Sequence, residues 1–410
     1  MAVFLLIGGR FDLDVGANSI CIRNIALELN KRGHNVLAIT NSWGKDSYHE
    51  INEIKIWGVK ESIYDFFEGC LKKKRLLWNV AFKIVSLIRR VVLVPFYPNV
   101  AAIRCIRINK LAKKLILQYK VDCVICFYRP IESLFCGLNL KRSFDANIQV
   151  FDFHLDLLKS ETKVMLNSFF HHKINRFLKK EYEAIDYLFL PESEKCDGLD
   201  EKVVYTGFPV CLLDEQVSSF DALFSKDFIN CVYVGSLDCS NRNPLYAIEL
   251  MNLFNLRSSQ KIILHIWGFV DDETKEIIER FDFVKYRGLL DNTYSQSVLE
   301  QSDFILNVGN KNTYSMLPSK IFKSFLSGKP ILNFVKTEKD VSLRYFKEYG
   351  FALNLFEMEL DKESHYKLFN QFVMSNKGKE IDPPYDLIKK YTPEYIVDKI
   401  EEKCNAEVKK

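Results

Sequence analysis

The sequence has 410 residues, of which 48% are hydrophobic and 27% are charged, and its formal net charge is +4. This length exceeds one ordinary domain and suits two globular domains, each with its own core. The opening apolar run over residues 3–7 is too short for a signal peptide, and no window approaches about 18 apolar residues, so we expect a cytoplasmic protein without a spanning helix.

The first elements predict a strand, a helix and a second strand. Residues 3–7 form the first apolar run, a glycine-containing loop follows, and Asn18 or Ser19 is expected to cap the helix. Four residues at helical spacing predict its buried face: Ile22, Ile25, Ala26 and Leu29. The cationic turn and glycine at 31–33 end the helix, and residues 36–39 predict the next strand. This order indicates a βαβ unit with a parallel sheet.

The remaining elements continue the alternation in two series. Further strands are predicted at residues 121–127, 148–153 and 187–190, then at 231–234, 262–267, 284–286, 304–308 and 330–334, with a helix over 245–254. Residues 207–209 (Gly-Phe-Pro) mark the end of the first series. The sequence therefore predicts an α/β protein with two Rossmann-like, doubly wound domains facing across a cleft.

The predicted domains divide the chain into four parts. Residues 1–207 form the first domain and 208–229 the linker. Residues 230–385 form the second domain, and 386–410 form a terminal helix that packs back on the first.

Two short patterns suggest metals but have simpler explanations. Cys123 and Cys126 have C-x-x-C spacing inside an apolar run that predicts a buried strand, and no second pair or histidine cluster accompanies them. Asp12 and Asp14 form a D-x-D that arises easily by chance. We expect reduced core thiols and no metal site.

The segment 71–120 is strongly basic, with 13 Lys or Arg and no Asp or Glu. A cationic cluster over 72–75 opens it, and apolar residues follow at helical spacing: Leu76, Val80, Ile84, Leu87 and Val91. A second helix over 105–119 is expected to pack its apolar stripe on the domain. Because soluble surfaces usually mix both signs, we expect this segment to dock the first domain on an anionic membrane surface, at the inner face of the cell membrane.

Several stretches resemble glycosyltransferases of the GT-B type. The first is GANSICIRNIALELNKRGHNV, which is similar to the first helix of that family. In the second half, VYVGSLDCSNRNP, LHIWGF, VKYRGLLDN, SDFILNVGN and LPSKIFKSFLSGKPIL follow in the order of the donor domain. The last block is the most specific. It resembles retaining sugar transferases of capsule, exopolysaccharide and cell-wall gene clusters.

This resemblance implies a donor site in the second domain. A nucleotide sugar carries a pyrophosphate, and members of the family bind it without a metal, at a helix amino terminus with nearby cations. The matching positions here are Gly235, Arg242, Leu317, Pro318, Ser319 and Lys320. Gly288 and Leu289 match the position whose backbone faces the nucleobase.

The resemblance also implies an acceptor side in the first domain. Gly16 and Asn18 match the loop before the first helix. His154, in VFDFHLD, matches a histidine that retaining members place beside the transferred sugar, where it hydrogen-bonds the sugar. Asp156 is expected to orient His154 or bind the acceptor.

Two positions depart from the family pattern. Relatives with the L-P-S-K block usually have an acidic residue where this chain has Lys323, and another eight residues earlier, where it has Ser315. A lysine cannot accept hydrogen bonds from ribose hydroxyls. Either another group binds the ribose, Lys323 contacts a phosphate, or the site has decayed. The expected Gly-Arg pair is also replaced by Gly235 and Ser236.

The main hypothesis is therefore a metal-independent, retaining glycosyltransferase without a cofactor. Its expected partners are a UDP- or GDP-sugar, a saccharide or polyprenyl-diphosphate-linked acceptor and an anionic membrane, but no nucleic acid. The alternative is a weak or inactive GT-B subunit that binds a nucleotide sugar or stabilises a partner transferase. An epimerase of the same fold is disfavoured because its catalytic carboxylates are not recognisable. A dinucleotide dehydrogenase is disfavoured because G-x-G-x-x-G is absent from the first strand–helix junction.

Overall fold

The computed structural model describes residues 1–9, 11, 17–42, 46–60, 102–128, 130–144, 147–154, 167–191, 201–212, 224–314, 317–359 and 361–408. The chain divides into two compact units. Unit 1 comprises Met1–Pro209 and Tyr391–Lys410, and unit 2 comprises Val210–Lys390. No helix in the described ranges has both the length and the apolar character needed to cross a membrane.

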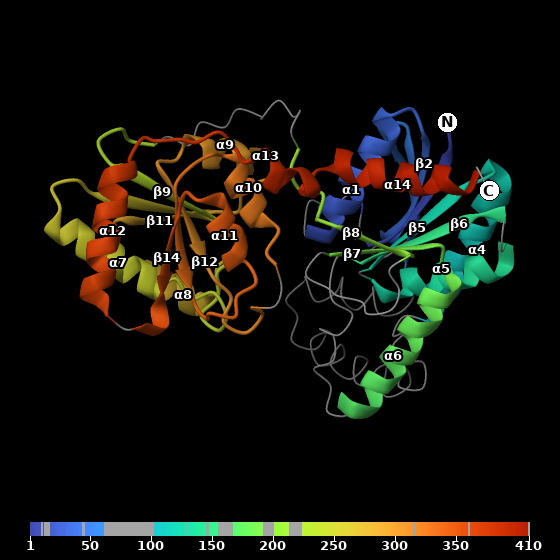
Figure 1. The fold of residues 1–410 in the computed structure, drawn as a ribbon, viewed down its shortest axis with the longest axis horizontal. Helices are drawn as coiled ribbons and strands as arrows, with labels where there is room; N and C mark the ends of the chain where they lie inside the picture. The colour runs from blue at the N-terminus through green and yellow to red at the C-terminus, as the bar shows by residue number, and fades with distance from the viewer. Residues whose placement is uncertain are drawn as a thin grey trace. The chain divides into compact units, whose positions relative to one another are not determined.

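Unit 1 is built on a sheet that, within the described residues, has eight strands (Figure 1). They are β1 (Val3–Ile7), β2 (Asn35–Ser42), β3 (Ser47–Ile51), β4 (Ile54–Lys60), β5 (Cys123–Tyr128), β6 (Gln149–His154), β7 (Tyr187–Pro191) and β8 (Val203–Thr206). Their spatial order is β3-β4-β2-β1-β5-β6-β7-β8, and all neighbours are parallel except β3 and β4. The order reverses between β1 and β5, which is the topological switch point of this sheet.

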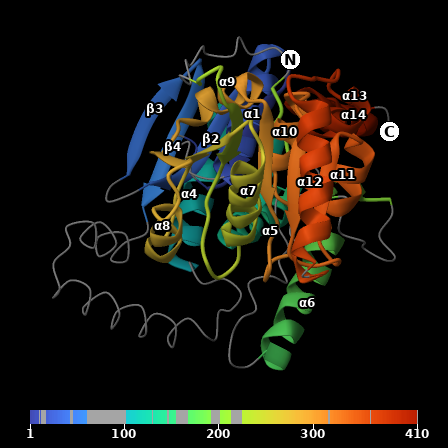
Figure 2. The ribbon, with the colours of Figure 1, turned by 90° about the vertical axis from the view of Figure 1, so that its left-hand side faces the viewer.

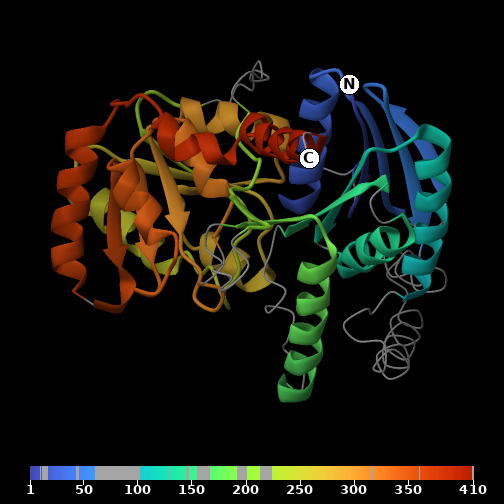
Figure 3. The same cartoon turned by 45° about the vertical axis from the view of Figure 1, so that its right-hand side comes forward.

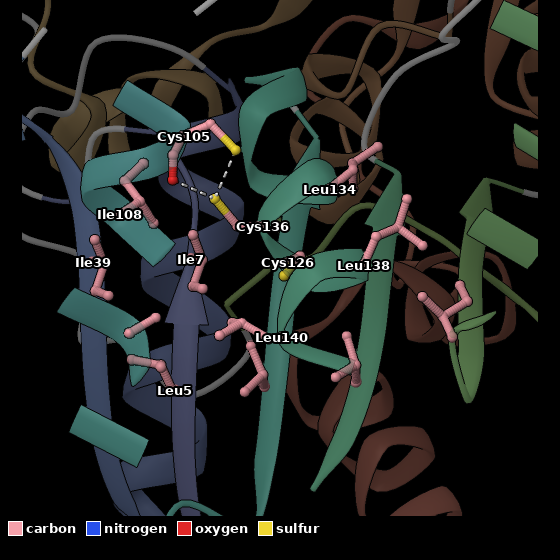
Figure 4. Close-up of a cluster of buried hydrophobic side chains, with 14 of the residues drawn as sticks. Leu5, Ile7, Ile39, Cys105, Ile108, Cys126, Leu134, Cys136, Leu138 and Leu140 are labelled. Atoms are coloured by element: carbon pink, nitrogen blue, oxygen red, sulfur yellow. Dashed lines mark hydrogen bonds between the residues drawn. The ribbon is translucent and has the colours of Figure 1, made fainter. Parts of the chain in front are cut away.

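Helices cover both faces of this sheet. On one face lie α1 (Ala17–Lys31) and α14 (Pro393–Val408), and on the other lie α4 (Ala102–Tyr119) and α5 (Ile131–Phe144). The close-up in Figure 4 shows Leu5, Ile7 and Ile39 from the strands meeting side chains from α4 and α5. Next to α5, helix α6 (Asn167–Ala184) runs out beyond the sheet, as the views in Figures 1, 2 and 3 agree.

An ion-pair network ties α14 to the end of α1. The guanidinium of Arg32 donates to Glu28 and, at 2.7 Å each, to Asp398 and Glu401 of α14. The ring of His34 lies 2.8 Å from Glu401 as well. Arg32 is only 24% exposed, so this network is better shielded from solvent than an ordinary surface pair.

Unit 2 has a six-stranded, fully parallel sheet within the described residues. Its strands are β9 (Ile229–Val234), β10 (Ile262–Trp267), β11 (Val284–Gly288), β12 (Phe304–Val308), β13 (Ile331–Val335) and β14 (Ala352–Phe356). The spatial order β11-β10-β9-β12-β13-β14 is that of a dinucleotide-binding fold, with its switch point between β9 and β12.

The helices of unit 2 also form two layers. The layer packed on the main core cluster holds α7 (Leu245–Arg257), α8 (Asp272–Ile278) and α12 (Lys362–Asn376). The opposite layer holds α9 (Ser295–Gln301), α10 (Lys320–Leu326), α11 (Leu343–Tyr349) and α13 (Tyr385–Ile388). Three short 3-10 turns complete the described chain at Asn292–Tyr294, Glu357–Glu359 and Lys389–Tyr391.

A ladder of asparagines crosses three neighbouring strands of unit 2. Asn307 donates to Asn333 at 2.8 Å, and Asn333 donates to Asn354 at 2.7 Å. The three residues are register partners on β12, β13 and β14. Asn307 and Asn333 are buried and Asn354 is half-buried, so the ladder provides hydrogen bonds for two amides that water does not reach.

The strand predictions are confirmed, because every predicted run lies on an observed strand. Four observed strands were not predicted, namely β3, β4, β8 and β14. The cap prediction for α1 is wrong: the helix begins at Ala17, so Asn18 and Ser19 lie in its first turn. Its end is as predicted, with Gly33 at φ +83°. Cys123 and Cys126 are buried in β5, which confirms the buried-strand reading.

Two domain-level expectations have different outcomes. The structure divides the chain after Pro209 and before Tyr391, while the acceptor- and donor-binding roles of the units stay predictions. Of the basic segment, residues 71–101 lie outside the described residues. The rest forms α4, whose buried Cys105, Ile108 and Ala112 confirm the predicted packed stripe.

Candidate functional site

The predicted donor residues converge at the switch point of unit 2. The loop after β9 carries Gly235 and Arg242, and the loop after β12 leads to Lys320 at the start of α10. The two loops are joined, because the backbone N–H of Lys311 donates to Asn241 at 3.0 Å. Ligands of such sheets bind outside the carboxyl ends of the strands at this point.

Lys320 reaches back from α10 over the end of β9. Its Nζ donates to the hydroxyl of Tyr233 at 2.7 Å and lies 4.1 Å from the centre of that ring. The Tyr233 hydroxyl in turn donates to the carbonyl of Ser236. Burial of the ammonium group, and then the nearby Arg242, hold the pKa of Lys320 well below its ordinary value. A cation in this position is therefore destabilised until an anion arrives.

Arg242 lies beside Lys320 and also faces neutral partners. Its Nε donates to the side-chain oxygen of Asn310, and one terminal nitrogen is 3.3 Å from the hydroxyl of Ser236. Within the described residues, Lys320 forms no ion pair with an acidic side chain, and the hydrogen bonds of the Arg242 guanidinium go to neutral oxygens. Two cations side by side without a carboxylate between them are suited to binding a polyanion.

Glycines end the strands on this side of the site. Gly235 has φ +142° and Gly268 has φ +128°, values that side chains rarely adopt. A Cβ on Gly268 would lie 2.0 Å from the carbonyl oxygen of Gly235. The absence of both side chains lets the ends of β9 and β10 approach each other and leaves Lys320 packed directly over Gly235.

The predicted nucleobase position lies at the end of β11. Gly288 has φ +81°, and its carbonyl accepts from the N–H of Gly268 at 2.8 Å. Leu289 is 80% exposed, and Phe269, after β10, is 63% exposed. The strand ends thus present an apolar edge next to the cations, which suits a flat heterocycle beside a diphosphate.

The start of α10 differs from the expectation of free backbone donors. Leu317 is buried, and Ser319 makes no side-chain cap. The N–H groups of Ile321 and Phe322 already donate to the carbonyls of Pro318 and Ser319. The Lys320 side chain, more than the helix terminus, therefore supplies the positive charge of this loop.

Of the two positions that differ from the family pattern, the structure describes only one. Lys323 lies on α10 and donates to the hydroxyl of Ser295, the first residue of α9, at 3.0 Å. Its ammonium thus holds two helices together at the expected ribose position. Ser315 lies outside the described residues, as do Gly16 and Asp156 on the acceptor side.

Unit 1 holds the other predicted residues. Asn18 is half-buried in the first turn of α1. His154 ends β6, as predicted, but it is only 3% exposed, and its Nε2 lies 2.8 Å from an oxygen of Glu181 on α6. The ring is therefore held by a buried carboxyl group that sequence reasoning missed.

Sequence reasoning missed Tyr233, Asn310 and Glu181. The role of each depends on the direction in which its side chain points. Tyr233 reads as a core aromatic in VYVG, and Asn310 reads as a loop residue. For Glu181 a signal was present. It lies four residues after the buried Phe177, so helical periodicity places both on the inner face of α6.

Comparison with known proteins identifies the architecture. No family model and no curated protein sequence matches the chain. Among solved structures, an α,α-trehalose 6-phosphate synthase from Burkholderia multivorans matches with a TM-score of 0.57 at 10% identity, covering 99% of each chain. The spinosyn rhamnosyltransferase SpnG, complexed with spinosyn aglycone, matches with a TM-score of 0.50 at 11% identity, covering 98% of this chain and all of the other.

A protein of a different activity also matches. It is a candidate UDP-N-acetylglucosamine 2-epimerase from Listeria monocytogenes, with a TM-score of 0.50 at 13% identity, covering 95% of this chain and 93% of the other. At such identities the likeness establishes the fold. The predicted fold class is confirmed: the chain is an α/β protein with two Rossmann-like sheets that matches structures of the GT-B type.

Proposed function

We propose that this chain is a glycosyltransferase that takes a sugar from a nucleotide-activated donor. The observation that carries the proposal is Lys320, which lies beside Arg242 at the switch point without an acidic ion-pair partner among the described residues. A nucleoside diphosphate would supply the missing negative charge. As the sugar leaves, more charge develops on the diphosphate, and the same cations stabilise it in the transition state.

The donor fits this site as a UDP- or GDP-sugar bound without a metal. The diphosphate lies against Lys320 and Arg242, and the base lies along the apolar edge at Gly288 and Leu289. The resemblance to retaining transferases adds His154 as the group beside the transferred sugar, with retention of the anomeric configuration. It also supports a saccharide or polyprenyl-diphosphate-linked acceptor in cell-surface polysaccharide synthesis.

The direct test is binding of nucleotide sugars to the full chain. A panel of UDP-, GDP-, dTDP- and CMP-sugars is screened by thermal shift, with and without EDTA. A ligand at 100 times its dissociation constant stabilises the fold by about 2.7 kcal/mol. Lys320→Met should weaken binding by roughly 1.5–3 kcal/mol, the range for a charged hydrogen bond. Lys347→Met, at an exposed position of α11, is the matched control.

Two results would overturn the donor site. One is equal affinity in the wild type and Lys320→Met. The other is binding that EDTA abolishes, because the proposed contacts come from protein cations alone. Activity is then measured as release of nucleoside diphosphate with and without lipid-linked saccharides.

The acceptor side is proposed to lie at an anionic membrane. Helix α4 has no acidic residue, and its outer stripe joins Ile106 and Leu117, 69% and 73% exposed, with Lys110 and Lys113. These positions share one face because they follow one another at three- and four-residue spacing. Apolar side chains between lysines are typical of a helix that lies in the headgroup region.

A second candidate function is a subunit that binds a nucleotide sugar without turning it over. The observation that favours it is Lys323, which donates to Ser295 where relatives have an acidic ribose ligand. Binding in the panel without turnover on any acceptor would support this candidate. Faster donor hydrolysis by Lys323→Glu would show that the native site has decayed.

The epimerase reading is tested in the same assays. Two carboxyl groups, Asp152 and Glu181, do lie near His154, and both are 0% exposed. Incubation with UDP-N-acetylglucosamine alone, followed by analysis of the sugar configuration, separates epimerisation from transfer.

A further inference from the structure

A buried cluster of three ionisable groups lies under the end of β6 in unit 1. Asp152 and His154 point to the same face of the strand because they are two residues apart, and Glu181 meets them from α6. Asp152 and Glu181 are 0% exposed, and His154 is 3% exposed. The Nε2 of His154 lies 2.8 Å from Oε1 of Glu181.

Small side chains on the neighbouring α5 and β5 leave room for this cluster. Gly137 of α5 faces Asp152, and a Cβ there would lie 2.9 Å from Oδ1 of that carboxyl and 2.9 Å from Sγ of Cys126. Cys126 is also the register partner of Asp152 on β5. The backbone of α5 therefore closes over the carboxyl and excludes water from it.

The two carboxyl groups influence each other's protonation. The charge of Glu181 raises the pKa of Asp152, as expected for two buried carboxyl groups that lie near each other. Among the described residues, neither oxygen of Asp152 nor Oε2 of Glu181 has a hydrogen-bond partner. Two ionised carboxylates in one dry pocket repel each other, so we infer that one of them carries a proton that it can donate to the other.

The surroundings of Asp152 and Glu181 raise the pKa of both carboxyl groups. Burial, and then the charge of Glu181, raise the pKa of Asp152 well above its ordinary value. Burial raises the pKa of Glu181 to about 7. Above that pH, Glu181 is the carboxylate, and its Oε1 accepts from Nε2 of His154.

We propose that Glu181 is a positioning residue that fixes the orientation and tautomer of His154, and that Asp152 supports it by donating its proton. The arrangement repeats the logic of the carboxylate in a catalytic triad, which holds an imidazole by one nitrogen without touching the substrate. Its use in catalysis rests on the proposed function, in which His154 lies beside the sugar. The positioning itself is independent of turnover.

The test is NMR of the full chain labelled with ¹⁵N-histidine, at about pH 8 where Glu181 is ionised. The chain has seven histidines, and the signal that disappears in His154→Asn identifies the ring. We expect a proton on Nε2 that exchanges slowly with water. Asp152→Asn should keep this signal, because an amide N–H replaces the acid O–H as donor. Glu181→Leu should abolish it.

Controls make the outcome decisive. Glu183→Gln changes an exposed carboxylate on the same helix and should leave the signal unchanged. A proton on Nδ1 instead of Nε2, or a signal that survives Glu181→Leu, overturns the proposal. If Glu181→Leu does not fold, Glu181→Gln decides: a neutral amide accepts more weakly, so the Nε2 proton should move upfield and exchange faster. An unmoved signal contradicts the assignment.

Turnover separates this proposal from the function it extends. If the chain transfers sugar, the control Glu183→Gln should leave kcat unchanged, while Glu181→Leu should lower kcat at least tenfold with little change in KM. If no nucleotide sugar binds at all, the proposed function fails, and the NMR result still decides whether Glu181 holds the ring.

Discussion

The two units place opposite charges at the ends of their parallel strands. In unit 2, Lys320 and Arg242 direct their hydrogen bonds to neutral oxygens, and among the described residues neither forms an ion pair with an acidic side chain. In unit 1, the buried Glu181 lies 2.8 Å from Nε2 of His154, and its charge raises the pKa of the nearby Asp152. The first arrangement gains most when an anion binds. The second is complete without a ligand and serves to hold one side chain still.

Replacing Gly268 by alanine should disturb unit 2 most. The new Cβ would meet the Gly235 carbonyl oxygen at 2.0 Å, and φ +128° is unfavourable for any side chain. We expect a loss of about 4 kcal/mol of stability together with the nucleotide site. Gly378→Ala is the control: its φ is +70° but no atom lies within 4 Å, so it should cost only about 1 kcal/mol. Equal melting temperatures for the two variants would contradict this account.

The carboxyl pair should make unit 1 more stable in mild acid. A free glutamate ionises near pH 4.5, whereas burial raises the pKa of Glu181 to about 7. Between these values the folded state binds more protons than the unfolded state, so stability falls as the pH rises through this window. The stabilising contribution of Glu181 is fully present below about pH 4.5. The loss is on the order of 3 kcal/mol.

The measurement is the urea dependence of unfolding at several pH values. Glu181→Gln should remove most of the slope, because the amide does not titrate, and Glu183→Gln should retain it. The raised pKa of Asp152 acts with the same sign. A wild-type stability that rises between pH 5 and 7 would contradict the raised pKa of Glu181.

Nucleotide-sugar binding should take up a proton through Lys320. Burial lowers its pKa in the free protein, and a bound diphosphate favours the charged form. Affinity should fall about tenfold per pH unit once the pH exceeds the pKa of free Lys320, and stay flat below it. Calorimetry in buffers of different ionisation heat counts the protons. Lys320→Arg keeps its charge and should take up none; an equal count in both proteins would contradict the model.

The smallest expected effect concerns membrane binding, which should depend on exposed lysines of unit 1 and not on those of unit 2. Changing Lys110, Lys113 and Lys114 to glutamine should weaken co-sedimentation with anionic liposomes by about 1 kcal/mol per residue. Added salt should weaken it too. Three exposed lysines of unit 2, namely Lys347, Lys367 and Lys379, are the control. Equal binding to neutral liposomes would remove electrostatic docking.

Prediction from sequence succeeded where burial alone sets the pattern. The buried parallel strands are continuous apolar runs, such as residues 304–308, and were found. The edge strand β3 alternates half-buried and exposed residues and was missed, although Tyr48 and Glu50 show the expected alternation. β8 has only four residues, too few for a pattern.

Only the site residues that match the motifs of the resembling family were predicted. Lys320 and Arg242 were placed by motif, and their loops do meet. The contact of Lys320 with Tyr233 depends on how a side chain folds back over a strand end, which no local pattern encodes. Likewise, the role of Lys323 follows from α9, whose Ser295 it contacts from 28 residues away.

The asparagine ladder has a consequence for how unit 2 assembles. Apolar runs such as those of β12 and β13 would pair almost equally well one residue out of step. A slip by one residue turns Asn333 towards the other face of the sheet and leaves the buried amide of Asn307 and the half-buried amide of Asn354 unmatched. Each lost amide bond costs roughly 1–3 kcal/mol in a dry interior. The ladder thus selects the register of the sheet. Strands that pair in the correct register are stabilised, whereas misaligned strands are less stable and separate before they pair again.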